Sequence, residues 1–312
     1  MLHHLLRVAD LSARDLGQLL VESRAHKADP RRARELLSGK SVTLYFDKPS
    51  TRTRISFETA VHRLGGLPVT VGPNDLQMGR GETIEDTARV ISRYASAFVT
   101  RTFRDADVAR FAAAASIPVI NALTDGHHPC QAVADVLTLE ERFGKVGGLV
   151  VTYVGAGNNV VHSLVEACAL LGAHVRVSTP AKYAADEAIL ANAAAIAAQH
   201  GGSVSLLGDP AEAVRGADAV YTDTWLSMGD PPEEREERLE ILAPYRVDAA
   251  LMARAKSEAI FLHCLPAHRG EEVTDEVADS PASKIFDQAE NKLHTAVAIL
   301  EALVKQSLEG RA

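Results

Sequence analysis

Residues 41–58 read SVTLYFDKPSTRTRISFE, and this stretch decides the fold because it joins a strand to a helix. Residues 41–46 are rich in β-branched and aromatic side chains, which favours a strand, and residues 56–64 have the apolar spacing of a helix. A helix that begins just after a strand directs free backbone N–H groups and the positive end of its dipole toward the loop between them. The stretch therefore predicts an anion site at a strand end.

The side chains of this loop strengthen that prediction. Three hydroxyls and the cations Lys48, Arg52 and Arg54 lie within residues 48–54. A cation near a helix N-terminus opposes the dipole by about 0.3 to 1 kcal/mol, so two arginines there need a compensating anion. A compact phosphate fits these donors. The alternative is a capped helix whose basic first turn is simply solvated.

Outward from this stretch, short β-rich runs alternate with longer helical runs, a pattern typical of parallel sheets. Strands are expected at residues 41–46, 67–71, 97–101, 117–121, 149–154, 174–178, 203–207, 219–222 and 260–263. Helices are expected at residues 56–64, 83–94, 131–143, 184–198 and 289–308. Glycines punctuate the chain after residue 143, so we expect two α/β domains that meet near that helix. The apolar stripe of the last helix must be buried, and we expect it to return to the first domain.

Composition excludes several classes of protein. The chain has 312 residues, enough for about two domains, and 46% hydrophobic with 24% charged residues is ordinary for a globular protein. A net charge of −8 provides no cationic field for nucleic acid. Three cysteines without a CxxC pair do not make a disulfide framework, and no stretch has the apolar length of a signal peptide or a membrane span. We expect a cytoplasmic protein.

Two glycine-containing segments resemble nucleotide-binding loops without matching them. Gly39-Lys40-Ser41 lacks the earlier glycine of a triphosphate loop and precedes a strand. Residues 155–160 read GAGNNV and follow a strand, but Val160 occupies the third glycine position of a dinucleotide fingerprint. The paired asparagines there either satisfy local backbone groups or offer amides to a polar ligand, and the spacing favours neither.

Polar residues gather at three further strand ends or helix starts. His128 and Gln131 lie three residues apart at a helix entrance, where they either cap the helix or face the phosphate site. Asp223 precedes a segment, residues 224–229, that either is structural or hinges a lid. Cys264 follows an apolar strand between His263 and His268, but no second ligand pair accompanies them, so no metal is expected. A buried structural cysteine is the alternative.

Four segments resemble, in order, the motifs of the ornithine carbamoyltransferases within the aspartate/ornithine carbamoyltransferase family. They are Ser50-Thr51-Arg52-Thr53, His128-Pro129-Cys130-Gln131, the segment from Asp223 through Ser227-Met228-Gly229, and His263-Cys264-Leu265-Pro266. The first resembles the carbamoyl phosphate motif of the whole family, and the other three resemble the ornithine branch. The resemblance spans nearly the whole chain.

The resemblance implies two doubly wound parallel-sheet domains of similar size. Residues 1–143, completed by the C-terminal helix 289–312, would bind carbamoyl phosphate, and residues 144–288 would bind ornithine. The family is typically built from trimers, so a homotrimer or a multiple of trimers is expected. No cofactor and no metal are implied.

The resemblance also assigns roles residue by residue. Arg101, His128, Asp223 and Cys264 would be catalytic, with Arg101 between phosphate and carbamoyl oxygen. The residues that would bind carbamoyl phosphate are Ser50, Thr51, Arg52, Thr53, Gln77 from a neighbouring subunit, Arg101, His128, Gln131, Cys264, Leu265 and Lys292. The residues that would hold ornithine are Asn159, Asp223, Ser227 and Met228.

Two positions depart from the family pattern. Ala156 stands where the family usually has aspartate in Gly-Asp-Gly, and Lys292 stands where it usually has arginine in Glu-Asn-Arg-Leu-His. Lysine keeps the charge but loses the planar five-donor fork, so we expect weaker carbamoyl phosphate binding.

The expected reaction transfers a carbamoyl group from carbamoyl phosphate to the side-chain amine of L-ornithine, giving L-citrulline and phosphate for arginine biosynthesis or breakdown. The substrates are then the only partners expected besides other copies of the chain, with no nucleic acid and no membrane. One alternative is a carbamoyltransferase for another amine, such as putrescine or an acylated ornithine. Others are a non-catalytic phosphometabolite-binding protein and a nucleotide-dependent oxidoreductase.

Overall fold

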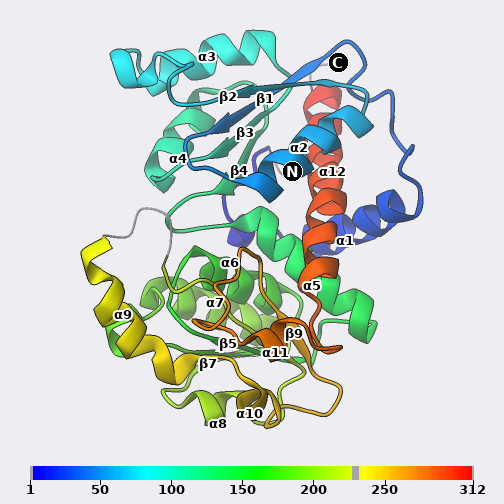
Figure 1. Cartoon of the computed structure of the whole chain (residues 1–312). Helices are drawn as coiled ribbons and strands as arrows, with labels where there is room; N and C mark the ends of the chain where they lie inside the picture. The colour runs from blue at the N-terminus through cyan, green and yellow to red at the C-terminus, as the bar shows by residue number, and fades with distance from the viewer. Residues whose placement is uncertain (1–2, 227–231, 311–312) are drawn as a thin grey trace. The chain divides into compact units, whose positions relative to one another are not determined.

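The computed structural model describes residues 3–226 and 232–310 of the chain. These residues form two compact units, one reaching to Ala134 and resuming at Glu290, the other spanning Asp135–Ala289. Both boundaries fall within helices, α5 (Pro129–Phe143) and α12 (Ile285–Glu309). As expected, most of the last helix belongs to the first unit (Figure 1).

The first unit is built on a four-stranded parallel sheet of order β2-β1-β3-β4. Its strands are β1 (Ser41–Phe46), β2 (Leu67–Val71), β3 (Phe98–Arg101) and β4 (Val119–Leu123). Its helices are η1 (Val8–Asp10), α1 (Ala13–Ala28), α2 (Thr51–Arg63), η2 (Met78–Arg80), α3 (Ile84–Tyr94) and α4 (Asp105–Ala114), with parts of α5 and α12.

Helices cover both faces of this sheet (Figure 1). Tyr45 and Phe98 pack under α3 and α4, where the rings of Phe98 and Phe111 stack with centroids 4.0 Å apart. Helix α2 buries Phe57 and Val61 and contacts β1 and β2. The unit is therefore a doubly wound layer structure with a core on each side of the sheet.

The second unit is built on a five-stranded parallel sheet of order β7-β6-β5-β8-β9. Its strands are β5 (Val150–Val154), β6 (His174–Ser178), β7 (Ser203–Leu206), β8 (Ala219–Tyr221) and β9 (Ile260–Leu262). Its helices are α6 (Asn159–Leu170), η3 (Ala181–Tyr183), α7 (Glu187–Gln199), α8 (Pro210–Val214), η4 (Pro232–Glu234), α9 (Arg235–Leu242), η5 (Ala243–Tyr245), α10 (Ala249–Met252) and α11 (Asp275–Ala278). Helices α6 and α7 lie on one face of the sheet and α8 and α10 on the other (Figure 1).

Strand order positions the sites. In the first sheet the winding reverses between β1 and β3, and in the second it reverses between β5 and β8. Ligands of doubly wound sheets bind outside the carboxyl ends of the strands at such a reversal. The segments after β1, β3, β5 and β8 are therefore the expected ligand sites. Ser50, Arg101, Asn159 and Asp223 lie in or next to them.

The α/β class with two doubly wound parallel sheets is confirmed, with small shifts at element ends. Helix α2 begins at Thr51 rather than residue 56, because the Ser50 hydroxyl caps it. Strand β4 covers Val119–Leu123 instead of residues 117–121, since Pro118 has no N–H for the ladder. Helix α12 begins at Ile285, four residues before the predicted start at residue 289.

Among the described helices, none combines the length and the hydropathy that crossing a bilayer requires.

Candidate functional site

The loop after β1 turns directly into α2, as an anion site requires. Ser50 is the N-cap, and its Oγ accepts a hydrogen bond from the Thr53 N–H at 3.3 Å. No acidic residue lies in the first turn of α2. The positive end of the helix therefore has no acidic side chain of its own first turn to neutralise it.

The three cations of this loop have different surroundings. Lys48 is buried, forms an ion pair with Asp125 and lies 4.3 Å from the centre of the Phe103 ring. The exposed Arg54 forms an ion pair with Glu58, one turn along α2, at 2.9 Å. Arg52 is half-buried, and its side chain has no hydrogen bond or ion pair to any residue within 3–226 or 232–310. Of the three, Arg52 is the cation left available for an anion.

A second group of polar side chains surrounds the entrance of α5. Arg101 ends β3, His128 directly precedes α5, and both are buried. Lys292, buried on α12, donates to the Gln131 Oε1 at 2.5 Å. Gln131 lies in the first turn of α5, so the sequence-predicted Arg101, His128, Gln131 and Lys292 come together in one place.

The electrostatics of this group keep His128 neutral. Burial lowers the pKa of His128 well below its usual 6.5, and the charges of Lys292 and Arg101 lower it further. The same burial raises the pKa of the neighbouring Cys130 thiol to about 12. A neutral imidazole beside two cations can donate one hydrogen bond to a carbonyl oxygen without adding a charge.

Gln77, which is also predicted to bind carbamoyl phosphate, lies between β2 and α3. It is exposed and immediately precedes η2, and its carbonyl accepts from the Arg80 N–H at 2.8 Å. Among the described residues, no contact joins its side chain to the α5 group.

In the second unit, the Asn158 side chain bonds the local backbone, which is the first of the two alternatives left open by the sequence, and it also bonds an acidic side chain. Its Oδ1 caps α6 by accepting from the Val160 and Val161 N–H groups, at 3.0 and 3.3 Å. Its Nδ2 donates to the Asp223 Oδ2 at 2.8 Å. The predicted Asn159 is half-buried and forms the first residue of α6.

Close backbone packing explains why residue 157 is a glycine, without any role in dinucleotide binding. A Cβ placed on it would lie 2.2 Å from the Ala185 nitrogen, so the backbone of residues 184–185 passes too closely for any side chain. The glycine therefore serves the packing of two chain segments.

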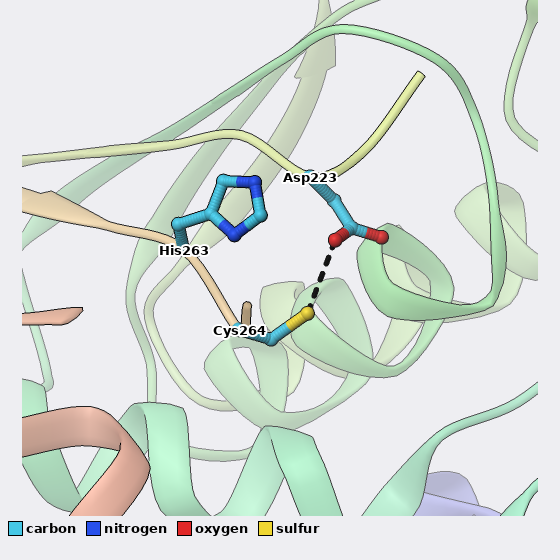
Figure 2. A group of neighbouring side chains, drawn as sticks. All are labelled: Asp223, His263 and Cys264. Carbon is cyan, nitrogen blue, oxygen red and sulfur yellow. Dashed lines mark hydrogen bonds between the residues drawn. The ribbon is translucent and has the colours of Figure 1, made fainter. Parts of the chain in front are cut away.

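Asp223 and Cys264 meet at the carboxyl ends of the neighbouring strands β8 and β9. The Cys264 Sγ donates to the Asp223 Oδ1 at 3.1 Å, and Figure 2 shows the two side chains pointing toward one another. Asp223 is buried, whereas Cys264 is partly accessible. A carboxylate that accepts from both a thiol and the Asn158 amide is oriented from two sides.

The turn after Cys264 is held by its histidine. Leu265 has a φ of +60°, a left-handed conformation that costs a leucine roughly 1 to 2 kcal/mol. The Leu265 N–H donates to the His263 Nδ1 at 2.8 Å, and the His263 Nε2 lies 3.2 Å from the Glu272 Oε1. His263 and Glu272 are fully buried. The strained turn is thus fixed by a buried imidazole and carboxylate.

The group formed by Asp223, His263 and Cys264 is poorly arranged to bind a metal. Potential ligand atoms of Asp223, His263 and Cys264 lie within 4.8 Å of one another. Both ring nitrogens of His263, however, are engaged by the Leu265 N–H and by Glu272. Coordination of a metal would break one of these contacts and release the turn.

Ser227 and Met228, predicted to hold ornithine, lie outside the described residues. The site residues that sequence reasoning missed are Asn158 as the partner of Asp223 and Glu272 as the partner of His263. The sequence singled out Asn158 by its place at a strand-to-helix turn but gave no signal for its partner, because Asp223 is distant along the chain. Glu272 offered no signal, since it is one of several acids in an exposed-looking segment.

Two families of domains match the chain. The carbamoyl-P binding domain of aspartate/ornithine carbamoyltransferase matches residues 3–141, and the Asp/Orn binding domain matches residues 147–303. The chain is 50% identical to ornithine carbamoyltransferase of Acidothermus cellulolyticus over 304 residues, which cover 97% of each protein. It is 47% identical to that of Bacillus subtilis, covering 96% of this chain and 93% of the relative.

Solved structures of carbamoyltransferases also superpose on the chain. The ornithine carbamoyltransferase from Pyrococcus furiosus superposes with a TM-score of 0.94 at 48% identity, covering 97% of both chains. A mutant of N-acetyl-L-ornithine transcarbamylase superposes with a TM-score of 0.87 at 32% identity, covering 97% of this chain and 100% of that one.

Proposed function

The chain belongs to the aspartate/ornithine carbamoyltransferase family, and on that premise we propose that it transfers the carbamoyl group of carbamoyl phosphate to the side-chain amine of L-ornithine, giving L-citrulline and phosphate. One observation carries the proposal: relatives about half identical over nearly their whole length are named ornithine carbamoyltransferase. The geometry of each unit supplies the chemistry that such a transfer needs.

Carbamoyl phosphate binds to the first unit in this proposal. Arg52 and the α2 N-terminus, with Ser50, Thr51 and Thr53, hold the phosphate. This is supported by the Arg52 side chain, which has no ion pair with any of the residues that the structure describes. The remaining contacts come from Arg101, His128, Gln131 and Lys292, with Leu265, Cys264 and a neighbouring subunit's Gln77. Because Lys292 binds the oxygen of the Gln131 amide, it orients that amide as well as adding positive charge.

Ornithine binds to the second unit. Asp223 takes one ammonium end of the substrate, supported by the Asn158 amide that orients its carboxylate. Cys264, Asn159, Ser227 and Met228 complete the set. Deprotonating an amine with the ordinary pKa of lysine costs about 4.6 kcal/mol at pH 7, so the site must favour the neutral nucleophile. Exclusion of water together with Asp223 is our proposed means of doing so.

The neutral amine then attacks the carbamoyl carbon. Arg101 and the neutral His128 stabilise the charge that develops on the carbonyl oxygen, while Arg52 and the hydroxyls stabilise the departing phosphate. A neutral His128 suits this role because burial and two neighbouring cations lower its pKa well below 6.5.

The setting of the reaction is part of the proposal. We propose arginine biosynthesis as the direction, since a 49% identical relative from Pyrococcus furiosus is named anabolic. We also propose a homotrimer, or a multiple of trimers, in a reducing cytoplasm, which suits three cysteines that remain thiols.

A direct test measures ureido product from carbamoyl phosphate with ornithine, N-acetylornithine, putrescine or aspartate as acceptor. The expected result is citrulline from ornithine at a rate far above every other acceptor, with none when carbamoyl phosphate is omitted. A preference for another amine would reassign the acceptor. Tight carbamoyl phosphate binding without product from any acceptor would contradict enzymatic function altogether.

A further inference from the structure

Behind the contact between Asp223 and Cys264 lies a ring of three buried polar side chains. They are Asp135 on α5, Tyr221 on β8 and Gln288 on α12, and all three are fully buried. The Gln288 Nε2 donates to the Asp135 Oδ1 at 2.6 Å and to the Tyr221 hydroxyl at 3.0 Å. The hydroxyl in turn donates to the Asp135 Oδ2 at 3.2 Å. The ring is closed, since each pair of its members shares a hydrogen bond.

Gln288 also reaches the strand that carries Cys264. Its Oε1 accepts from the His263 N–H at 2.9 Å. Strand β9 is the edge of its sheet, and Phe261 uses its outward groups to pair with the backbone of Ala282 and Lys284. The next outward N–H along the edge is that of His263, which is buried. Gln288 therefore completes the edge of the strand with a side chain, just before Cys264.

The amide of Gln288 can adopt only one orientation in this ring. A carboxylate only accepts hydrogen bonds, so the Asp135 oxygens require the NH2 group of the amide. The amide oxygen must then face the His263 N–H, which only donates. Tyr221 remains a donor because burial, followed by the charge of Asp135, raises its pKa well above 10. Asp135 and Tyr221 thus determine which atom of Gln288 meets the strand.

We propose that Gln288 is a positioning residue for Cys264, an inference that rests on the proposed role of Asp223 and Cys264 toward ornithine. His263 directly precedes Cys264, and Tyr221 lies two residues before Asp223. One hydrogen-bonded ring therefore holds the strand ends from which both partners of the 3.1 Å thiol contact extend. Without it, the buried His263 N–H would lose its partner and the thiol would lose its fixed direction.

The first test is Gln288→Met, which keeps the length of the side chain and removes its hydrogen bonds. We expect kcat/KM for ornithine to fall about tenfold to hundredfold, because the hydrogen bond from the thiol to the Asp223 carboxylate is weakened, with a smaller change in KM for carbamoyl phosphate. Gln306→Met is the control, because it makes the same exchange near the other end of the same helix. Tyr221→Phe removes a single hydroxyl and should give a smaller loss of the same kind.

A second readout does not depend on catalysis. Cys130 and Cys168 are buried, so iodoacetamide should alkylate Cys264 selectively in the native protein, as peptide mapping would verify. We expect Gln288→Met to change this rate several-fold.

In Gln288→Glu, a protonated glutamate can donate to Asp135 and accept from the His263 N–H, but it has no second donor for Tyr221. Its activity and alkylation rate relative to wild type should therefore recover in part between about pH 9 and about pH 6. Gln288→Met should show no such recovery.

Several outcomes would overturn the inference. A folded Gln288→Met with wild-type alkylation and wild-type kinetics is one, and equal losses toward both substrates is another. Should Gln288→Met fail to fold, wild-type behaviour of Tyr221→Phe together with a pH-independent Gln288→Glu would have the same consequence. Failure of the proposed function is distinguishable, because wild-type protein would then make no citrulline while the alkylation rates still respond to Gln288.

Discussion

At the scale of single residues, Arg52 and Arg54 are two positions apart on the first turn of α2 but have different partners. Arg54 is exposed and paired with Glu58, whereas the half-buried Arg52 has no ion pair within the described chain. We expect Arg52→Ala to lower kcat by at least about a hundredfold, because one lost charge-stabilising donor costs that much. Arg54→Ala should stay near wild type. Citrulline assays on both variants, with thermal melts to verify folding, make the comparison.

Two outcomes for these variants would contradict the prediction. Wild-type turnover in a folded Arg52→Ala variant would show that Arg52 does not bind the phosphate. A loss of equal size in Arg54→Ala would mean that the basic charge of the turn matters rather than the particular arginine.

Cys264 is the second residue whose surroundings predict an effect. Its thiol donates to Asp223, so Cys264→Ala removes one of two side-chain donors that orient that carboxylate. We expect kcat/KM for ornithine to fall about tenfold, with a smaller change in carbamoyl phosphate binding. Steady-state kinetics with each substrate varied in turn would measure the two effects.

Cys264→Ser is the matched variant, since a hydroxyl still donates to the carboxylate. It should lose less than Cys264→Ala. Equal losses toward both substrates in Cys264→Ala would count against a role at the ornithine end.

At the scale of elements, helices α1 and α12 are joined inside the first unit by a buried hydrogen bond. Glu301 on α12 contacts His26 on α1 and Lys305 one turn further along α12. The hydrogen bond from His26, with smaller help from Lys305, lowers the pKa of Glu301 to about 2. An unfolded glutamate titrates near 4.5, so the pair stabilises the fold by about 3 kcal/mol above that pH. This contribution is lost as the pH falls from about 4.5 toward about 2.

Urea unfolding of wild type and Glu301→Gln would measure this difference. We expect Glu301→Gln to be less stable by up to about 3 kcal/mol near pH 7, and the gap to shrink by about pH 3, where wild type has lost part of the contribution. Glu309→Gln, on the exposed last turn of α12, should leave stability unchanged at both pH values. A gap that does not depend on pH would mean that the glutamine fails for reasons of packing.

At the scale of the whole molecule, the proposed trimer makes each site depend on two chains. If Gln77 serves a neighbouring subunit, Arg52→Ala and Gln77→Ala damage the same site from different chains. A mixture of the two inactive variants, unfolded and refolded together, should then regain activity. With random assembly in a closed ring, about a quarter of the sites hold both intact residues.

Activity of the mixture and its mass by light scattering are the measurements. Each variant refolded alone is the control and should stay inactive. If the mixture forms trimers but stays inactive, Gln77 does not serve the site of a neighbouring subunit. A monomeric protein would contradict the proposed assembly itself.

Much of the fold could be predicted at this scale because its causes are local. Strands such as residues 41–46 and 174–178 are found where β-branched side chains concentrate, and these features do not depend on distant residues. The start of α2 was less predictable, because polar residues that cap a helix interrupt its apolar spacing. The candidate residues at Ser50, His128 and Cys264 were visible because each follows a strand or begins a helix in a motif of its own.

The sequence by itself determined the parallel α/β architecture, the strand ends that carry polar groups, and the family. Tertiary structure alone decided the partners: that Lys48 binds Asp125, that Lys292 binds Gln131, that Asn158 reaches Asp223, and that Gln288 completes the edge of β9. The physical reason is range. Propensity and periodicity act between residues a few positions apart, whereas a hydrogen bond between residues 131 and 292 exists only after the chain has brought them together.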